Sequence, residues 1–158
     1  MRIHPRLGRL AAPVLALLLA TAALAQSRAD VDKAIETNLG DPVKFHEAFT
    51  HLQQAVARHD AAAIAAMVSY PITINPHTNK AMRVRTPEAF AASYDKIITP
   101  HIAKVVKDQK YEQLFVNYQG AMFGSGEVWL AGICRDSACK QSEIRIITIQ
   151  NTTDPTKK

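Results

Sequence analysis

Few residues of this 158-residue chain have a type and spacing suited to chemistry. Glu127 is the most interesting carboxylate, because it is two residues from Trp129 in a strand-like run and would share a strand face with it. If that face lined a cavity, burial would raise the pKa of the Glu127 carboxyl group and suit it to act as a base. The alternative is that the glycine-rich turn before Glu127 leaves the side chain in solvent.

Aromatic side chains are the other candidates for a ligand cavity. These candidates are Tyr70, Tyr94, Tyr118 and Trp129. Each provides apolar surface together with one hydrogen-bonding group, which is what a small-molecule cavity uses. Cores and strands contain the same residues, so ordinary packing is the alternative for every one of them.

The histidines form no metal-binding or catalytic pattern. His46 and His51 resemble the two histidines of the helical zinc-protease motif HExxH, but they are five residues apart instead of four. At about 100° per residue their rings would point about 140° apart on a helix, so they do not easily share a metal ion. His59, His77 and His101 fall at a helix end, in a turn and in a first helical turn, where surface roles are commoner. We expect no metal and no cofactor.

Signatures of nucleophilic and phosphate chemistry are missing from the sequence. Gly124-Ser125-Gly126 lacks the flanking residues of a nucleophile elbow, and it joins two strand-like runs instead of a strand and a helix. Its glycines are typical of a hairpin turn. Because no acid–base or nucleophile set can be recognised, we expect a binding protein rather than an enzyme.

The first 25 residues predict a secretory signal peptide. Arg2, Arg6 and Arg9 precede the apolar run Leu10–Leu24, and Ala23-Leu24-Ala25 is a small-x-small cleavage signal. The run is about 15 residues long, whereas a membrane helix needs ~20, so an uncleaved anchor is the less favoured alternative. Cleavage after Ala25 would place the protein in the periplasm or outside the cell.

The net charge of +5 overstates how basic the remaining chain is. Three of the 19 Lys and Arg residues and none of the 14 acids lie within residues 1–25, which leaves 16 basic against 14 acidic residues. A net charge near +2, with no basic stripe, is weak evidence for nucleic-acid binding. We expect no nucleic-acid partner and no membrane span after cleavage.

Cys134 and Cys139 predict a structural disulfide. Two cysteines in an exported chain are expected to be oxidised together, and the four residues between them suit a four-residue hairpin loop. Redox catalysis would favour the shorter CxxC spacing, and a zinc site would need more ligands than two thiols.

Helix signals dominate the first two thirds of the chain. Three times a capping residue is followed by proline, at Asp41, Thr86 and Thr99, as at the start of a helix. An apolar stripe at helical spacing follows the first of these. Its members are Phe45, Phe49, Leu52 and Val56. We expect helices over 30–39, 42–58, 61–67, 87–97 and 101–108.

Strand signals begin at Tyr70 and fill the last third. Alternating apolar residues predict strands over 70–75 and 81–85, then over 114–118, 122–123, 127–134 and 141–149. The alternation slips at Ile146-Ile147, which indicates a bulge or a strand buried on both faces. Helices segregated from a mostly antiparallel sheet indicate an α+β fold, with helices packed on one face of a curved sheet.

The stretch Asn117-Tyr118-Gln119-Gly120, followed by Gly124-x-Gly126-Glu127-Val128-Trp129, resembles the NTF2-like superfamily, and in particular its small exported bacterial members. The resemblance covers residues 41–151, with 26–40 as an N-terminal segment and 152–158 as a tail. It implies a cone, in which a curved mixed or antiparallel sheet wraps around helices and leaves a cavity at the open end. Many members of this superfamily dimerise through the sheet, so a homodimer of that kind is one expectation for this chain.

The resemblance does not choose a function, because members of this superfamily include enzymes as well as binding and interaction domains. We expect an exported binding or accessory protein that holds a small ligand or a protein partner. The first alternative is a small cavity enzyme of isomerase or hydrolase type, with Glu127 as base and a tyrosine as polariser. The second is an inhibitor or immunity-type protein that acts through its sheet face.

Overall fold

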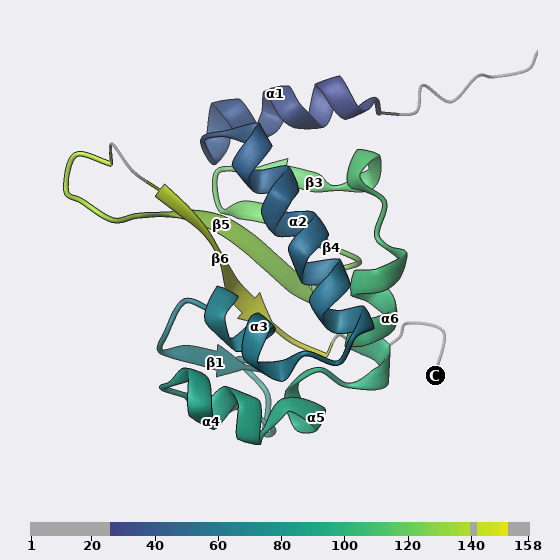
Figure 1. Cartoon of the computed structure of the whole chain (residues 1–158), viewed down its shortest axis with the longest axis vertical. Helices are drawn as coiled ribbons and strands as arrows, with labels where there is room; N and C mark the ends of the chain where they lie inside the picture. Colours follow the sequence, from purple (N-terminus) through teal and green to yellow (C-terminus); the bar gives the residue numbers. More distant parts are fainter. Residues whose placement is uncertain (1–25, 140–141, 152–158) are drawn as a thin grey trace, which may run out of the picture.

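The computed structural model describes residues 26–139 and 142–151 (Figure 1). Residues 1–25, where we expect the signal peptide, and the expected tail at 152–158 lie outside the described residues. Within the described residues, helices and a six-stranded open sheet form an α+β fold, as the sequence predicts. Helices are α1 (Arg28–Asn38), α2 (Pro42–Ala57), α3 (Ala61–Met67), α4 (Pro87–Ala92), α5 (Tyr94–Ile97) and α6 (Pro100–Asp108).

The cap-then-proline signals mark helix starts correctly. Asp41 accepts a hydrogen bond from the Val43 backbone N–H at 2.8 Å and begins α2. Thr86 and Thr99 cap α4 and α6 in the same way, with proline at the first helical position of each. The expected helix over 87–97 is wrong in one respect: it breaks at Ser93, which ends α4 and begins α5.

The sheet has the strand order β2-β1-β6-β5-β4-β3. Strands are β1 (Ile72–Ile74), β2 (Met82–Val84), β3 (Phe115–Asn117), β4 (Gly120–Phe123), β5 (Val128–Cys134) and β6 (Ser142–Ile149). All neighbours pair antiparallel except β1 and β6, which are parallel, so the sheet is mixed. The C-terminal strand therefore lies in the middle of the sheet.

The predicted slip in β6 is a β-bulge. Trp129 pairs with Thr148 and the next residue, Leu130, pairs with Ile146, so Ile147 is an extra residue on the β6 side. Both Ile146 and Ile149 are consequently buried, at 1% and 0% exposure.

The core lies between the helices and the inner face of the sheet. The four members of the α2 stripe are all buried. On the sheet side, Leu130 of β5 and Phe123 of β4 are fully buried. On β5, Gly132 allows a close approach of α1: a Cβ atom at this position would be 2.4 Å from the Leu39 carbonyl oxygen.

The predicted disulfide joins Cys134 and Cys139, whose Cα atoms are 4.8 Å apart. The expected four-residue loop between facing cysteines is wrong, because Cys134 at the end of β5 faces Ser142. Cys139 lies in the connection between β5 and β6, where it takes a positive φ of 50°. The disulfide thus closes a loop within the connection and does not cross-link two strands.

We expect the double variant Cys134→Ser, Cys139→Ser to lower the free energy of unfolding by about 2 kcal/mol, which is what closing so short a loop contributes in the chain-entropy model. Urea denaturation of the variant and of the oxidised wild type measures the difference. Reduced wild-type protein is the control and should match the variant. Two free thiols in the mass spectrum of the non-reduced protein would contradict the assignment.

Candidate functional site

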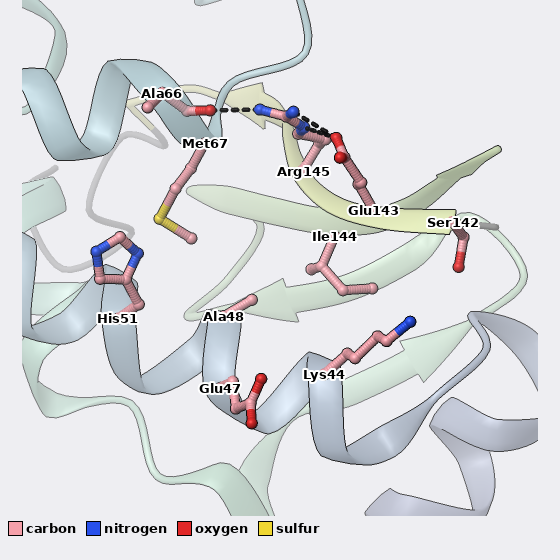
Figure 2. Close-up of a pocket in the computed structure, with 10 residues that line it drawn as sticks. All are labelled: Lys44, Glu47, Ala48, His51, Ala66, Met67, Ser142, Glu143, Ile144 and Arg145. Atoms are coloured by element: carbon pink, nitrogen blue, oxygen red, sulfur yellow. Dashed lines mark hydrogen bonds and ion pairs between the residues drawn. The ribbon is translucent and has the colours of Figure 1, made fainter. Parts of the chain in front are cut away.

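An open groove lies between the N-terminal half of α2 and the N-terminal half of β6 (Figure 2). Its volume is about 490 Å³. The lining residues are Lys44, Glu47, Ala48 and His51 from α2, Ala66 and Met67 from the end of α3, and Ser142, Glu143, Ile144 and Arg145 from β6. We call it the α2–β6 groove.

Helical spacing places the α2 residues along one side of the groove. Lys44, Glu47, Ala48 and His51 are separated by three, one and three residues, so they follow one face of the helix. Ala48 is half-buried and packs against the core, and Ile144 and Met67 complete an apolar floor. Because Ala48 is small, the helix leaves space above this floor.

The far rim of the groove is a charged network. Glu143 accepts hydrogen bonds from Arg145 and is 2.7 Å from an Arg135 guanidinium nitrogen. Arg145 also donates to the Ala66 carbonyl oxygen, so the same side chain connects β6 to the end of α3. The hydrogen bond from Arg145 holds the pKa of the Glu143 carboxyl group below its ordinary value of 4.5, and both arginine charges act in the same direction.

The near rim is less constrained. Within the described residues, Lys44, Glu47 and His51 form no ion pair. Their exposed side chains are therefore able to adjust to a ligand, whereas Glu143 and Arg145 hold each other in place.

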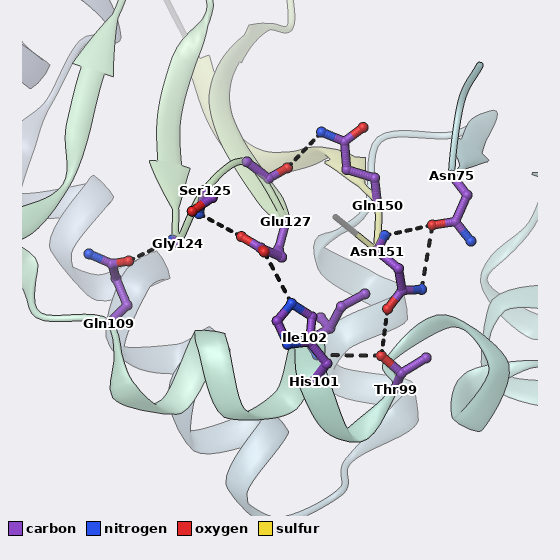
Figure 3. A network of polar contacts seen from close by, with 11 residues as sticks. Asn75, Thr99, His101, Ile102, Gln109, Gly124, Ser125, Glu127, Gln150 and Asn151 are labelled. Carbon is purple, nitrogen blue, oxygen red and sulfur yellow. Dashed lines mark hydrogen bonds and ion pairs between the residues drawn. The ribbon is translucent and has the colours of Figure 1, made fainter. Parts of the chain in front are cut away.

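A second polar cluster surrounds Glu127, which follows the β4–β5 turn (Figure 3). The Glu127 side chain is 4% exposed, and its Oε1 atom is 3.1 Å from Nε2 of His101 in the first turn of α6. Its Oε2 atom accepts the Ser125 backbone N–H at 2.6 Å. Of the two environments we considered for Glu127, the structure shows the buried one, and the contacts of the carboxylate include the His101 ring.

Gly124 makes room for this carboxylate. A Cβ atom on Gly124 would be 2.4 Å from Glu127 Oε2 and 2.6 Å from Val105 Cγ1, and the residue has a positive φ of 61°. Its backbone N–H donates to Gln109 Oε1 at 2.8 Å, which ties the turn to the end of α6. Both requirements explain the glycine at this position.

The chain after β6 closes the cluster from the other side. Gln150 donates from its side chain to the Gly126 carbonyl oxygen and from its backbone to the Glu127 carbonyl oxygen. Asn151 binds both Thr99, at the start of α6, and Asn75, at the end of β1. Four separate parts of the chain therefore meet around Glu127 (Figure 3).

The aromatic candidates do not gather around one cavity. Tyr70 donates its hydroxyl to the Ala65 carbonyl oxygen at 2.9 Å, and burial raises its pKa to about 12. Tyr94 is buried, which raises its pKa, and it packs edge-on against His59. Tyr118 is 79% exposed, and Trp129 packs on Phe115.

The remaining histidines also lie apart. His46 packs against Tyr111, with ring centroids 4.7 Å apart, and His51 lines the α2–β6 groove. Among the described residues there is no group of three or more His, Cys, Asp and Glu side chains that could hold a metal ion.

Sequence reasoning missed the α2–β6 groove, and in the second cluster it named Glu127 but not His101. The polar side chains of α2 follow the solvent face of an amphipathic pattern, and nothing local indicates that β6 lies opposite them. His101 was recognisable only as a first-turn residue, 26 positions from its partner Glu127. Comparison with protein-family models, with curated proteins and with solved structures finds no match for the chain.

We expect Glu143→Gln to reduce the loss of stability on acidification. The pKa of Glu143 is lower in the folded chain than its ordinary value, so the stabilisation it provides is complete above about pH 4.5 and disappears as the pH falls through the folded value. Urea midpoints at pH 7, 4 and 3 measure this dependence. Glu36→Gln on the exposed side of α1 is the matched control, and equal acid sensitivity in Glu143→Gln and wild type would contradict the role of the network.

Proposed function

We propose that this chain is an exported binding protein of the NTF2-like type, which holds a small amphipathic molecule in the α2–β6 groove. The observation that carries the proposal is the groove itself, with an apolar floor of Ala48, Met67 and Ile144 beneath a charged rim. Ligand sites of this kind combine an apolar surface with a few polar groups that fix orientation.

The rim favours a ligand with an apolar body and one polar head. Glu143 is already neutralised by Arg145 and Arg135, so it has little to offer a cationic ligand. Lys44 and Glu47 are exposed at the opposite rim and have opposite charges. A ligand head group can therefore meet a charge of either sign there, while its apolar part covers the floor.

The disulfide supports export, because structural disulfides persist in oxidising compartments and are rare in the bacterial cytosol. Within the described residues, no helix is long and apolar enough to cross a membrane. The predicted signal peptide at residues 1–25 is the sequence feature on which this part of the proposal depends.

The assignment to the NTF2-like type comes from the sequence resemblance over residues 41–151. The arrangement of helices against one face of an open six-stranded sheet supports it. Since one fold serves many activities, the binding role is argued from the groove and not from the fold.

A second candidate function is association through the outer face of the sheet. Phe115 pairs with Met122 and Met122 with Trp129, so these three side chains form an apolar row on the face opposite the core. Phe115 and Tyr118 are 53% and 79% exposed. We propose a second copy of this chain as the partner, in accord with the dimerisation that the resemblance implies.

The groove proposal predicts that amphipathic probes bind near Met67 and Ile144. We would titrate octanoate, octylamine and octanol, each below its aggregation concentration, and follow the methyl resonances of these two residues. Ala48→Leu should fill the groove and weaken binding of the best probe at least tenfold, because its larger side chain occupies the space above the floor.

Ala57→Leu, at the exposed end of the same helix, is the matched control and should bind as wild type does. The proposal is wrong if none of the three probes shifts these resonances, or if Ala48→Leu binds as tightly as Ala57→Leu.

For the sheet face, we expect the wild-type protein to sediment as a dimer and Phe115→Glu to sediment as a monomer, because a charge in the apolar row would be buried without a partner. Val43→Glu is the control, since Val43 is 65% exposed on α2. A monomeric wild type at all concentrations would rule out self-association.

A further inference from the structure

A second open pocket, of about 480 Å³, lies beside α6. It is lined by seven residues: His101, Lys104, Val105, Asp108, Gln109, Gln113 and Gly124. We call it the α6 pocket. Lys104 forms an ion pair with Asp108, one turn further along the helix. His101 and Lys104 are three residues apart on α6, so they project from the same side of the helix. The α2–β6 groove shares none of these residues.

The His101–Glu127 pair differs from an ordinary surface contact. His59 and Asp95 make a contact of similar length, 3.2 Å, but their side chains are 69% and 84% exposed. In the His101–Glu127 pair the histidine is 42% exposed and the carboxylate 4%. One partner therefore faces the pocket, while the other is enclosed by protein.

This geometry orients the imidazole ring. When Glu127 is ionised, its carboxylate only accepts hydrogen bonds, and the 3.1 Å contact then places a proton on Nε2 of His101. The lone pair is then on Nδ1, to which the described residues provide no hydrogen bond. Glu127 is held in turn by the Ser125 N–H, which means that base and orienting group are both positioned before any ligand arrives.

We propose that His101 is the acid–base catalytic residue of a hydrolytic site in the α6 pocket, that Glu127 is its positioning residue, and that the substrates are small esters with a short apolar acyl chain. The pocket lining contains no serine, threonine or cysteine, so water is the nucleophile. Val105 provides apolar surface for the acyl chain, and the volume suits a small molecule.

In the reaction, Nδ1 of His101 takes a proton from a water molecule as the water oxygen bonds to the ester carbonyl carbon. The electron pair of the C=O double bond moves to oxygen. The cation in the same lining is Lys104, whose ammonium group is shared with the Asp108 carboxylate. The C–O bond to the alcohol then breaks, and the leaving oxygen takes the proton from His101. The products are one carboxylic acid and one alcohol, with water consumed and the histidine regenerated.

A purely structural role for the pair makes a different prediction. If the contact served only to tie the β4–β5 turn to α6, its loss would change stability and not turnover. Kinetic parameters separate these roles, because Glu127 does not line the pocket and so should influence kcat and not KM.

The test is hydrolysis of p-nitrophenyl acetate and p-nitrophenyl butyrate by the oxidised protein. We expect saturable hydrolysis, a decrease of at least tenfold in kcat/KM for His101→Asn, and a decrease in kcat at nearly constant KM for Glu127→Gln. His59→Asn removes the exposed histidine–carboxylate pair and should stay within twofold of wild type. Circular dichroism checks the fold of each variant, and His101→Gln decides the matter if Glu127→Gln does not fold.

Three results would overturn the proposal. The first is a wild-type rate no higher than that of free imidazole at six times the protein concentration, a ratio that matches the six histidines of the chain. The second is an unchanged rate in both His101→Asn and His101→Gln. The third is a loss of rate in His59→Asn equal to that in His101→Asn. Ala57→Leu, outside both linings, should leave both hydrolysis and probe binding unchanged. The two sites share no residue, so each proposal is decided by its own assay.

Discussion

The pairing of β5 with β6 across the bulge at Ile147 is the constraint on which the rest of the structure depends. Side chains alternate between the two faces of a regular strand, so every second residue points into the core. Without the bulge, a β6 strand with Ile149 in the core would also direct Ile147 and Arg145 into it. A buried, unpaired guanidinium group would cost several kcal/mol. With the bulge, Ile146 enters the core, Ile144 reaches the groove floor, and Arg145 stays half-exposed, where it binds Glu143 and the end of α3.

Local signals predicted the elements well because the physics that forms them is local. A capping oxygen and a proline at the first helical position act within one turn, and all three such pairs begin helices. The slip at Ile146-Ile147 was visible for the same reason. The break at Ser93 was not, because Phe90, Tyr94 and Ile97 keep helical spacing and are all buried even though two short helices replace one. The cysteine pairing was predictable from its spacing and expected compartment, but the register of the connection was not.

Neither polar site could be predicted in the same way, because each depends on pairs that the chain brings together over a distance. Lys44 and Glu47 have the pattern of a solvated helix face, and only the placement of β6 turns that face into the side of a groove. Glu127 was recognised as a notable carboxylate, yet its burial depends on Gly124 leaving space and on α6 approaching with His101 in its first turn. Such contacts cannot be read from the spacing of residues in the sequence, because they form only when distant segments pack together in the fold.

Hydrogen bonds connect helix α2, which lines the α2–β6 groove, to the turn beside Glu127. The N-terminal half of α2 lines the groove, and further along the helix Gln53 donates to the carbonyl oxygens of Val106 and Gln109, where α6 would otherwise leave its last acceptors unsatisfied. The side chain of Gln109 then accepts the Gly124 N–H at the turn that precedes Glu127. Each step of this route is a hydrogen bond to backbone, so α2, α6 and the β4–β5 turn are tied to one another. Contacts of this kind favour sites that are largely formed before a ligand binds, in which affinity and rate depend on the side chains of each pocket and not on a change of fold.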